Sequence, residues 1–90
     1  MATEYLPVRC EIVGNPGRWE DVHTSLGRTF TDRQEAIDWG IAELDHDDFR
    51  IATLVDGKLA AIGWGIDDFG PDDGEDLLAI ARQLSVEVAA

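Results

Sequence analysis

The chain has 90 residues, of which 44% are hydrophobic, so it is long enough for one folded domain with a thin core. Nineteen Asp and Glu residues outnumber seven Lys and Arg residues, and the formal net charge at pH 7 is −12. This charge argues against direct binding of nucleic acid or of a membrane surface, since both require a basic footprint.

Cys10 is the one cysteine of the chain, which excludes an intramolecular disulfide and offers no metal-ligand spacing. It alternates with Leu6, Val8 and Ile12, so we expect a buried thiol. No charged segment followed by an apolar one opens the chain, and no apolar run reaches the length of a membrane span. We therefore expect a cytoplasmic protein.

The first 27 residues predict two strands. Residues 5–13 alternate between apolar and polar side chains, which is typical of a strand with one buried face. Pro7 lacks an N–H group and favours a place at the sheet edge or at the strand's first residues. Residues 14–17 form a turn by composition, and residues 18–25 predict a weaker strand without clean alternation.

A helix is predicted over residues 31–44. Thr31 with Gln34 matches a capping box at its start, and Ile37, Ile41 and Leu44 form its apolar stripe. Gly40 lowers helix propensity by about 1 kcal/mol relative to Ala, which indicates close packing against the sheet.

Residues 49–66 predict a β-hairpin that turns at Asp56-Gly57, because this dipeptide accepts the positive φ angles of a type I′ turn. A two-residue loop places Ile51 opposite Ile62. One face of the hairpin then carries larger apolar side chains and is expected to form the core: Phe49, Ile51, Thr53, Val55, Ala60, Ile62, Trp64 and Ile66. The other face is flatter and half apolar: Arg50, Ala52, Leu54, Leu59, Ala61, Gly63 and Gly65.

A second helix is predicted from a cap at Asp72 or Asp73 to Leu84, after a loop at residues 67–71. The last six residues either continue this helix or fray. Each half of the chain thus has a hairpin followed by an amphipathic helix. The sequence predicts a single α+β domain over residues 1–90, ββαββα-like, with an antiparallel sheet and both helices packed on one face.

Catalytic and metal-binding patterns are weak. The segment Asp45-His46-Asp47-Asp48 and the acids between residues 67 and 76 do not match the spacing of a Ca²⁺ loop. The sequence contains no GxSxG, P-loop or GxGxxG motif. Solvated loops and helix caps account for these acids, and we predict no enzyme activity, no cofactor and no metal site.

Trp39 is the tryptophan that we single out as a partner-binding residue, because it lies far from the apolar stripe of its helix. The alternative is that a loop or the C-terminal tail covers it. Trp19 and Trp64 are assigned to the core or its margin. Two clusters of aspartates complete the predicted binding surface: Asp45, Asp47 and Asp48 in one, and Asp67, Asp68, Asp72 and Asp73 in the other. Antiparallel helices would join the clusters into one negative ridge, which we favour, and parallel helices would leave two separate poles.

These features lead to three hypotheses. The first is a small protein-binding module whose acidic surface engages a basic partner protein, as an inhibitor or nucleic-acid mimic; the composition resembles small acidic inhibitors of this kind. The second is a structural protein that forms a weak homodimer through the flat hairpin face, at Ala52, Leu54, Leu59 and Ala61. Its acidity would then serve solubility or a salty cytoplasm, since the composition also resembles that of halophile-adapted proteins. The third is a metal-binding or hydrolytic protein that uses the acidic loops.

Overall fold

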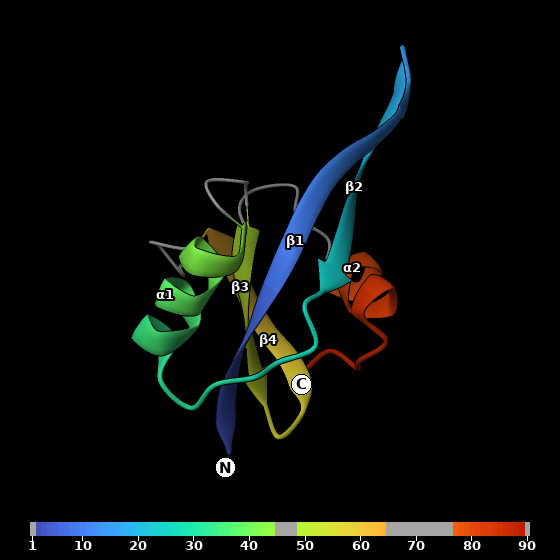
Figure 1. Cartoon of the computed structure of the whole chain (residues 1–90). Helices are drawn as coiled ribbons and strands as arrows, with labels where there is room; N and C mark the ends of the chain where they lie inside the picture. Colours follow the sequence, from blue (N-terminus) through green and yellow to red (C-terminus); the bar gives the residue numbers. More distant parts are fainter. Residues whose placement is uncertain (1, 45–48, 65–76, 90) are drawn as a thin grey trace.

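The computed structural model describes residues 2–44, 49–64 and 77–89 (Figure 1). Its elements in chain order are β1 (Thr3–Asn15), β2 (Arg18–Ser25), α1 (Arg33–Leu44), β3 (Phe49–Val55), β4 (Lys58–Trp64) and α2 (Leu77–Leu84). The four strands form an antiparallel sheet in the order β2-β1-β3-β4. The predicted α+β class and the ββαββα order are confirmed.

The β3–β4 hairpin turns where the sequence predicts. Asp56 and Gly57 have φ angles of 52° and 80°, as a type I′ turn requires. Beyond the pair Leu54–Leu59, however, the register shifts by a β-bulge, so that Thr53 faces Ala61. The predicted pair Ile51–Ile62 is therefore wrong: Ile51 lies opposite Gly63, and Ile62 lies opposite Ala52. One extra residue in β4 moves every later side chain to the other face of that strand.

The two helices pack on opposite faces of the sheet, not on one face as the sequence analysis expects (Figure 1). Ile51 of β3 packs with Ala36 and Ile37 of α1. Its neighbour Ala52 packs with the side chains of α2. Because consecutive residues of a strand point to opposite faces, α1 and α2 must cover different faces. The physical reason is that β3 is apolar on both faces, so that each face needs a helix to exclude water.

The larger core lies between the sheet and α2. The helix contacts the two outermost strands, β2 and β4, so the sheet curls around it. The buried side chains of this core are Leu6, Val8, Ala52, Leu54, Leu59, Ile62, Ile80, Ala81 and Leu84.

The N-cap of the first helix lies one residue later than predicted, and the helix begins at Arg33. Asp32, and not Thr31, is the N-cap, because its carboxylate accepts a hydrogen bond from the N–H of Gln34 at 3.4 Å. Gly40 packs as the sequence predicts: a Cβ atom at this position would lie 2.6 Å from the ring of Phe49. Ile41, which was assigned to the apolar stripe, is 51% exposed, and the buried stripe is Ala36, Ile37, Gly40 and Leu44.

The second helix ends in a Schellman motif. Ser85 has a φ of 60°, its N–H donates to the carbonyl of Arg82, and the N–H of Val86 donates to the carbonyl of Ala81. This turn directs the tail back along β4, where Val88 forms a parallel bridge with Leu59. The tail is therefore neither helical nor frayed over the described residues.

Pro7 lies in the middle of the sheet, between β2 and β3, and not at an edge. Its missing N–H falls where β2 ends at Ser25, so no ladder bond is lost there. Its carbonyl still accepts a hydrogen bond from the N–H of Leu26 at 3.2 Å. The proline is tolerated because the neighbouring strand has already left the ladder.

Candidate functional site

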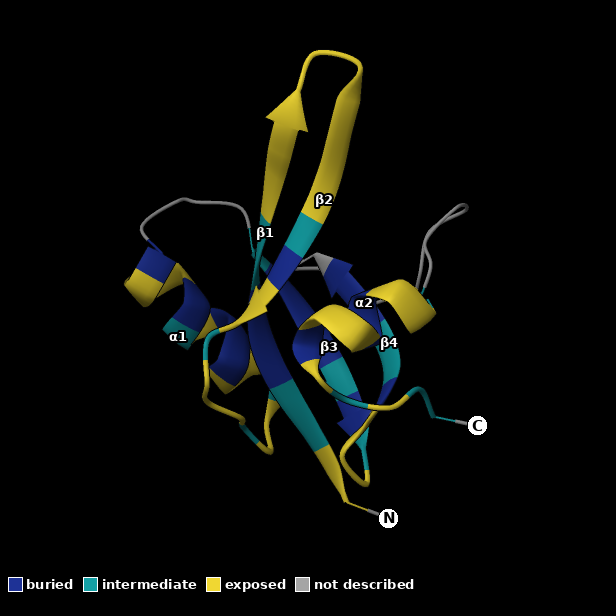
Figure 2. Cartoon of the chain, turned by 90° about the vertical axis from the view of Figure 1, so that its right-hand side faces the viewer, coloured by how far each residue is buried: buried dark blue, intermediate teal, exposed yellow. Residues whose placement is uncertain are grey.

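Residues 11–21 form an arm that stands away from the two helices and from the rest of the sheet (Figure 2). Among the described residues, β1 pairs with β3 as far as Arg9–Phe49, whereas β1 pairs with β2 as far as Asn15–Arg18. All residues of the arm are exposed. A two-stranded ribbon has no third strand or helix to bury its side chains, so its apolar residues remain in water.

One face of the arm carries two large apolar side chains. Trp19 is 60% exposed and Ile12 is 69% exposed. Ile12 pairs with Asp21 and Gly14 pairs with Trp19, so alternation places Ile12, Trp19 and Asp21 on the same face. The arrangement is an apolar pair beside a carboxylate. On the other face Val13 is 38% exposed and lies between Glu11 and Glu20.

The tip of the arm is built by glycine. Gly14 has a φ of 130°, and a Cβ atom there would lie 2.1 Å from the carbonyl oxygen of Arg18. Gly17, in the turn, has a φ of 86°. Neither conformation suits a residue with a side chain, so these two glycines determine the conformation of the turn that joins β1 and β2.

The base of the arm is fastened to α2 by Gln83. Its Oε1 accepts hydrogen bonds from the backbone N–H of His23 at 2.8 Å and from the His23 ring at Nδ1, at 2.9 Å. Its Nε2 donates to the carbonyl oxygen of Asp21 at 3.2 Å. The Nε2 atom of His23 lies 3.0 Å from Nη1 of the buried Arg50. Since Arg50 can only donate, this geometry assigns the His23 ring proton to Nδ1.

The adjoining side chains of His23 and Ser25 bond to other groups and not to each other. The ring nitrogens of His23 are committed to Gln83 and Arg50. The hydroxyl of Ser25 accepts from the N–H of Gly27 at 3.0 Å. Among the described residues, no group of three or more His, Cys, Asp and Glu residues could hold a metal ion.

Trp39 is half-buried on α1 and is covered in part by the loop before that helix. Its ring lies 5.7 Å from the ring of Phe30, centroid to centroid. The guanidinium carbon of Arg28 lies 4.9 Å from the Phe30 centroid and 5.8 Å from that of Trp39. The alternative considered for this residue, contact with a loop, is thus observed. Trp39 belongs to an aromatic cluster that holds the loop to α1.

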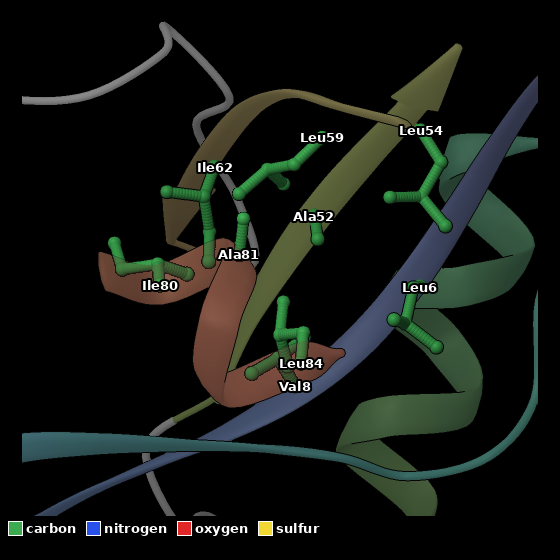
Figure 3. Close-up of a cluster of buried hydrophobic side chains, with 9 residues drawn as sticks. All are labelled: Leu6, Val8, Ala52, Leu54, Leu59, Ile62, Ile80, Ala81 and Leu84. Atoms are coloured by element: carbon green, nitrogen blue, oxygen red, sulfur yellow. The ribbon is translucent and has the colours of Figure 1, made fainter. Parts of the chain in front are cut away.

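The predicted self-association face does not exist as a surface. Ala52 and Leu59 are fully buried and Leu54 is 7% exposed, because α2 packs over them (Figure 3) and Val86 and Val88 of the tail pack against the same cluster. Ala61 is half-buried and pairs with Thr53, on the opposite side of the sheet. The error follows from placing both helices on one face, which would have left this face open.

The predicted acidic residues lie outside the described residues: Asp45, Asp47, Asp48, Asp67, Asp68, Asp72 and Asp73. The predicted ridge assumed two helices on one face, and this assumption is wrong. Ile66 of the expected core face also lies outside the described residues.

The exposure of Trp19 was not predicted from the sequence. Trp19 was assigned to the core or its margin, whereas 60% of the residue is exposed. The available signal was the lack of alternation in residues 18–25, which is untypical of a strand with a buried face. The exposure of Ile12 had no such signal, because its alternation with Leu6, Val8 and Cys10 continues unbroken.

No helix among the described residues is long and apolar enough to cross a membrane. Comparison of the chain with protein-family models, with curated proteins and with solved structures finds no match.

Proposed function

We propose that the chain is a protein-binding module that docks its arm, residues 11–21, onto a basic surface of a partner protein. The observation that carries this proposal is the exposure of Trp19 and Ile12 on one face of a projecting hairpin. Trp is enriched among the residues that dominate binding energy. Both side chains remain in water within the chain's own fold, whereas most of the large aliphatic residues described outside the arm are buried, largely in two cores.

The chemistry of the partner follows from charge. The chain has a formal net charge of −12, and Asp21 lies on the same face as Trp19 and Ile12. A surface with an apolar pocket and a rim of Lys or Arg complements this arrangement. The overall charge also steers the encounter with a cationic protein at low ionic strength.

Such a module excludes other polyanions from the surface that it occupies. Where that surface binds nucleic acid, the chain acts as an inhibitor. The expected readout is competition: addition of the chain releases nucleic acid from the partner, and the release weakens as salt screens the charges.

The test is affinity capture from cells that produce the chain, with variants of matched chemistry. Ile12→Ser removes an exposed isoleucine of the arm, and Ile41→Ser removes an exposed isoleucine of α1. We expect wild type and Ile41→Ser to capture the same partner. Ile12→Ser and Trp19→Ser should bind this partner with roughly 30-fold lower affinity, as expected when a dominant interface residue is truncated. Equal retention by all four proteins would contradict docking through the arm.

A further inference from the structure

An indole ring and a carboxylate stand next to each other on one face of the arm. Trp19 and Asp21 are two residues apart on β2, and alternation places both side chains on that face. Trp19 is 60% exposed, and Asp21 is exposed as well. No described residue makes a ring contact with Trp19 or an ion pair with Asp21. Both groups are therefore available to a ligand.

The arginines of the two arm strands belong to the opposite face. Arg9 of β1 and Arg18 of β2 occupy positions that alternate with those of Ile12 and Trp19. The fold does place an arginine on another indole: the guanidinium carbon of Arg28 lies 5.8 Å from the ring centroid of Trp39. Among the described residues, Trp19 has no cationic neighbour of this kind.

We infer that Trp19 and Asp21 bind one arginine side chain of the cationic partner; the inference rests on the function proposed above and names the residue that the arm recognises. Arginine suits both groups, because its planar guanidinium stacks on an aromatic ring and donates two parallel hydrogen bonds to a carboxylate. Lysine carries the same charge but has neither the plane nor the fork of donors.

The spacing of the two side chains fits a guanidinium between them. Residues two apart on one face of a strand are separated by about 6.5–7 Å. A stacked guanidinium lies about 3.5–4 Å from the ring that it covers. Its nitrogen atoms lie about 2.8 Å from the carboxylate oxygens that accept their hydrogen bonds. Together these two contacts span the separation between Trp19 and Asp21.

Ile12 and Gln83 complete the site. Ile12 pairs with Asp21 and is 69% exposed, so it offers an apolar surface to the methylene groups of the bound arginine. Gln83 donates a hydrogen bond of 3.2 Å to the backbone carbonyl of Asp21 and so fastens this part of β2 to α2. A backbone that is already held in place lowers the entropy cost of ordering the carboxylate on binding.

The inference is tested with two pentapeptides of equal charge, Lys-Lys-Arg-Lys-Lys and pentalysine, which differ by one guanidinium group. Each is titrated into the wild-type chain at low ionic strength, where charges are little screened. The NMR signal of the indole N–H of Trp19, assigned with the variant Trp19→Leu, reports on binding. We expect the arginine peptide to shift this signal and to bind about 3-fold more tightly than pentalysine.

Two variants of adjacent residues isolate the role of the carboxylate. Asp21→Asn and Glu20→Gln change the net charge equally, but Glu20 lies on the opposite face of the arm. We expect Asp21→Asn and Trp19→Leu to bind both peptides with equal affinity, and Glu20→Gln to keep the preference for arginine. Equal affinities in the wild-type chain, or a preference that survives in Asp21→Asn or in Trp19→Leu, would overturn the inference. The amide spectrum of each variant establishes that the fold persists.

Capture of the partner separates this inference from the proposed function. Weaker capture by Asp21→Asn than by Glu20→Gln supports the arginine site. A partner that both variants retain, but Trp19→Ser loses, leaves the proposed function standing and refutes the arginine site. A peptide preference that Asp21→Asn abolishes, without any captured partner that depends on the arm, leaves the arginine site standing and refutes the proposed function.

Discussion

The contact between Gly40 and Phe49 makes a prediction about stability in which two effects oppose each other. Replacing Gly40 with Ala raises helix propensity, which alone stabilises the fold by about 1 kcal/mol. The added Cβ, however, would meet three ring atoms of Phe49 at 2.6, 2.9 and 3.0 Å. Overpacking of this kind costs roughly 1–3 kcal/mol. The repulsion is the larger effect, so we expect Gly40→Ala to destabilise the protein by about 1 kcal/mol.

A double-mutant cycle isolates the repulsion. Phe49→Leu removes the two ring atoms that would lie closest to the new Cβ. In that background we expect Gly40→Ala to stabilise by about 1 kcal/mol, so that the coupling energy is about 2 kcal/mol. Urea unfolding followed by far-UV circular dichroism measures the free energy of unfolding of the four proteins.

The exposed Ala42 of α1 provides the control for helix propensity alone. We expect Ala42→Gly to cost about 1 kcal/mol in both backgrounds. A coupling energy near zero, with Gly40→Ala stabilising both backgrounds equally, would show that the ring of Phe49 does not pack against Gly40.

Three further predictions concern the covering of the sheet. Leu59 is fully buried and Leu78 is 52% exposed. In urea unfolding, Leu59→Ala should lower the free energy of unfolding by about 2–5 kcal/mol, and Leu78→Ala by less than about 0.5 kcal/mol. Equal decreases for the two variants would refute the burial of the hairpin face. Ser85 holds a left-handed conformation, so Ser85→Gly should raise the free energy of unfolding by up to about 1 kcal/mol, and a loss would argue against the Schellman motif. Gln83→Met removes hydrogen bonds to His23 and Asp21 and should cost about 1–2 kcal/mol and speed amide exchange at His23, whereas Arg82→Met, one residue earlier and exposed, should do neither.

Local rules predicted those elements whose conformation depends on a few neighbouring residues. The turn at Asp56-Gly57 follows from the φ angles that these two residues accept. The packing of Gly40 follows from the cost of glycine in a helix. These features do not depend on what the distant parts of the chain do.

The position of the helices could not be predicted by the same rules. The bulge after Leu59 changes which face the later residues of β4 occupy, and no turn or propensity signal marks it. The alternation in β3 also suggested one core face, whereas Ile51 and Ala52 are both fully buried. A strand that is apolar on both faces indicates cover on both sides, and this pattern was visible in residues 51–54.

The projection of the arm could not be predicted from the sequence for a different reason. Alternation in β1 continues through Leu6, Val8, Cys10 and Ile12, but burial depends on how far the neighbouring strand extends. Val8 is fully buried and pairs with Arg50 of β3, whereas Ile12 is 69% exposed and pairs with no residue of β3 as described. Pairing length is a tertiary property, so a sequence pattern cannot distinguish a core strand from an arm that projects beyond it.

The central claim, that the arm is the partner-binding surface, is tested most directly by a footprint on the complex. Amide hydrogen–deuterium exchange is measured for the free chain and for the chain bound to its captured partner. Docking through the arm predicts slower exchange in residues 11–21, with exchange in α1 and around Trp39 unchanged. Protection of α1 and Trp39, with the arm exchanging as fast as in the free chain, would contradict it.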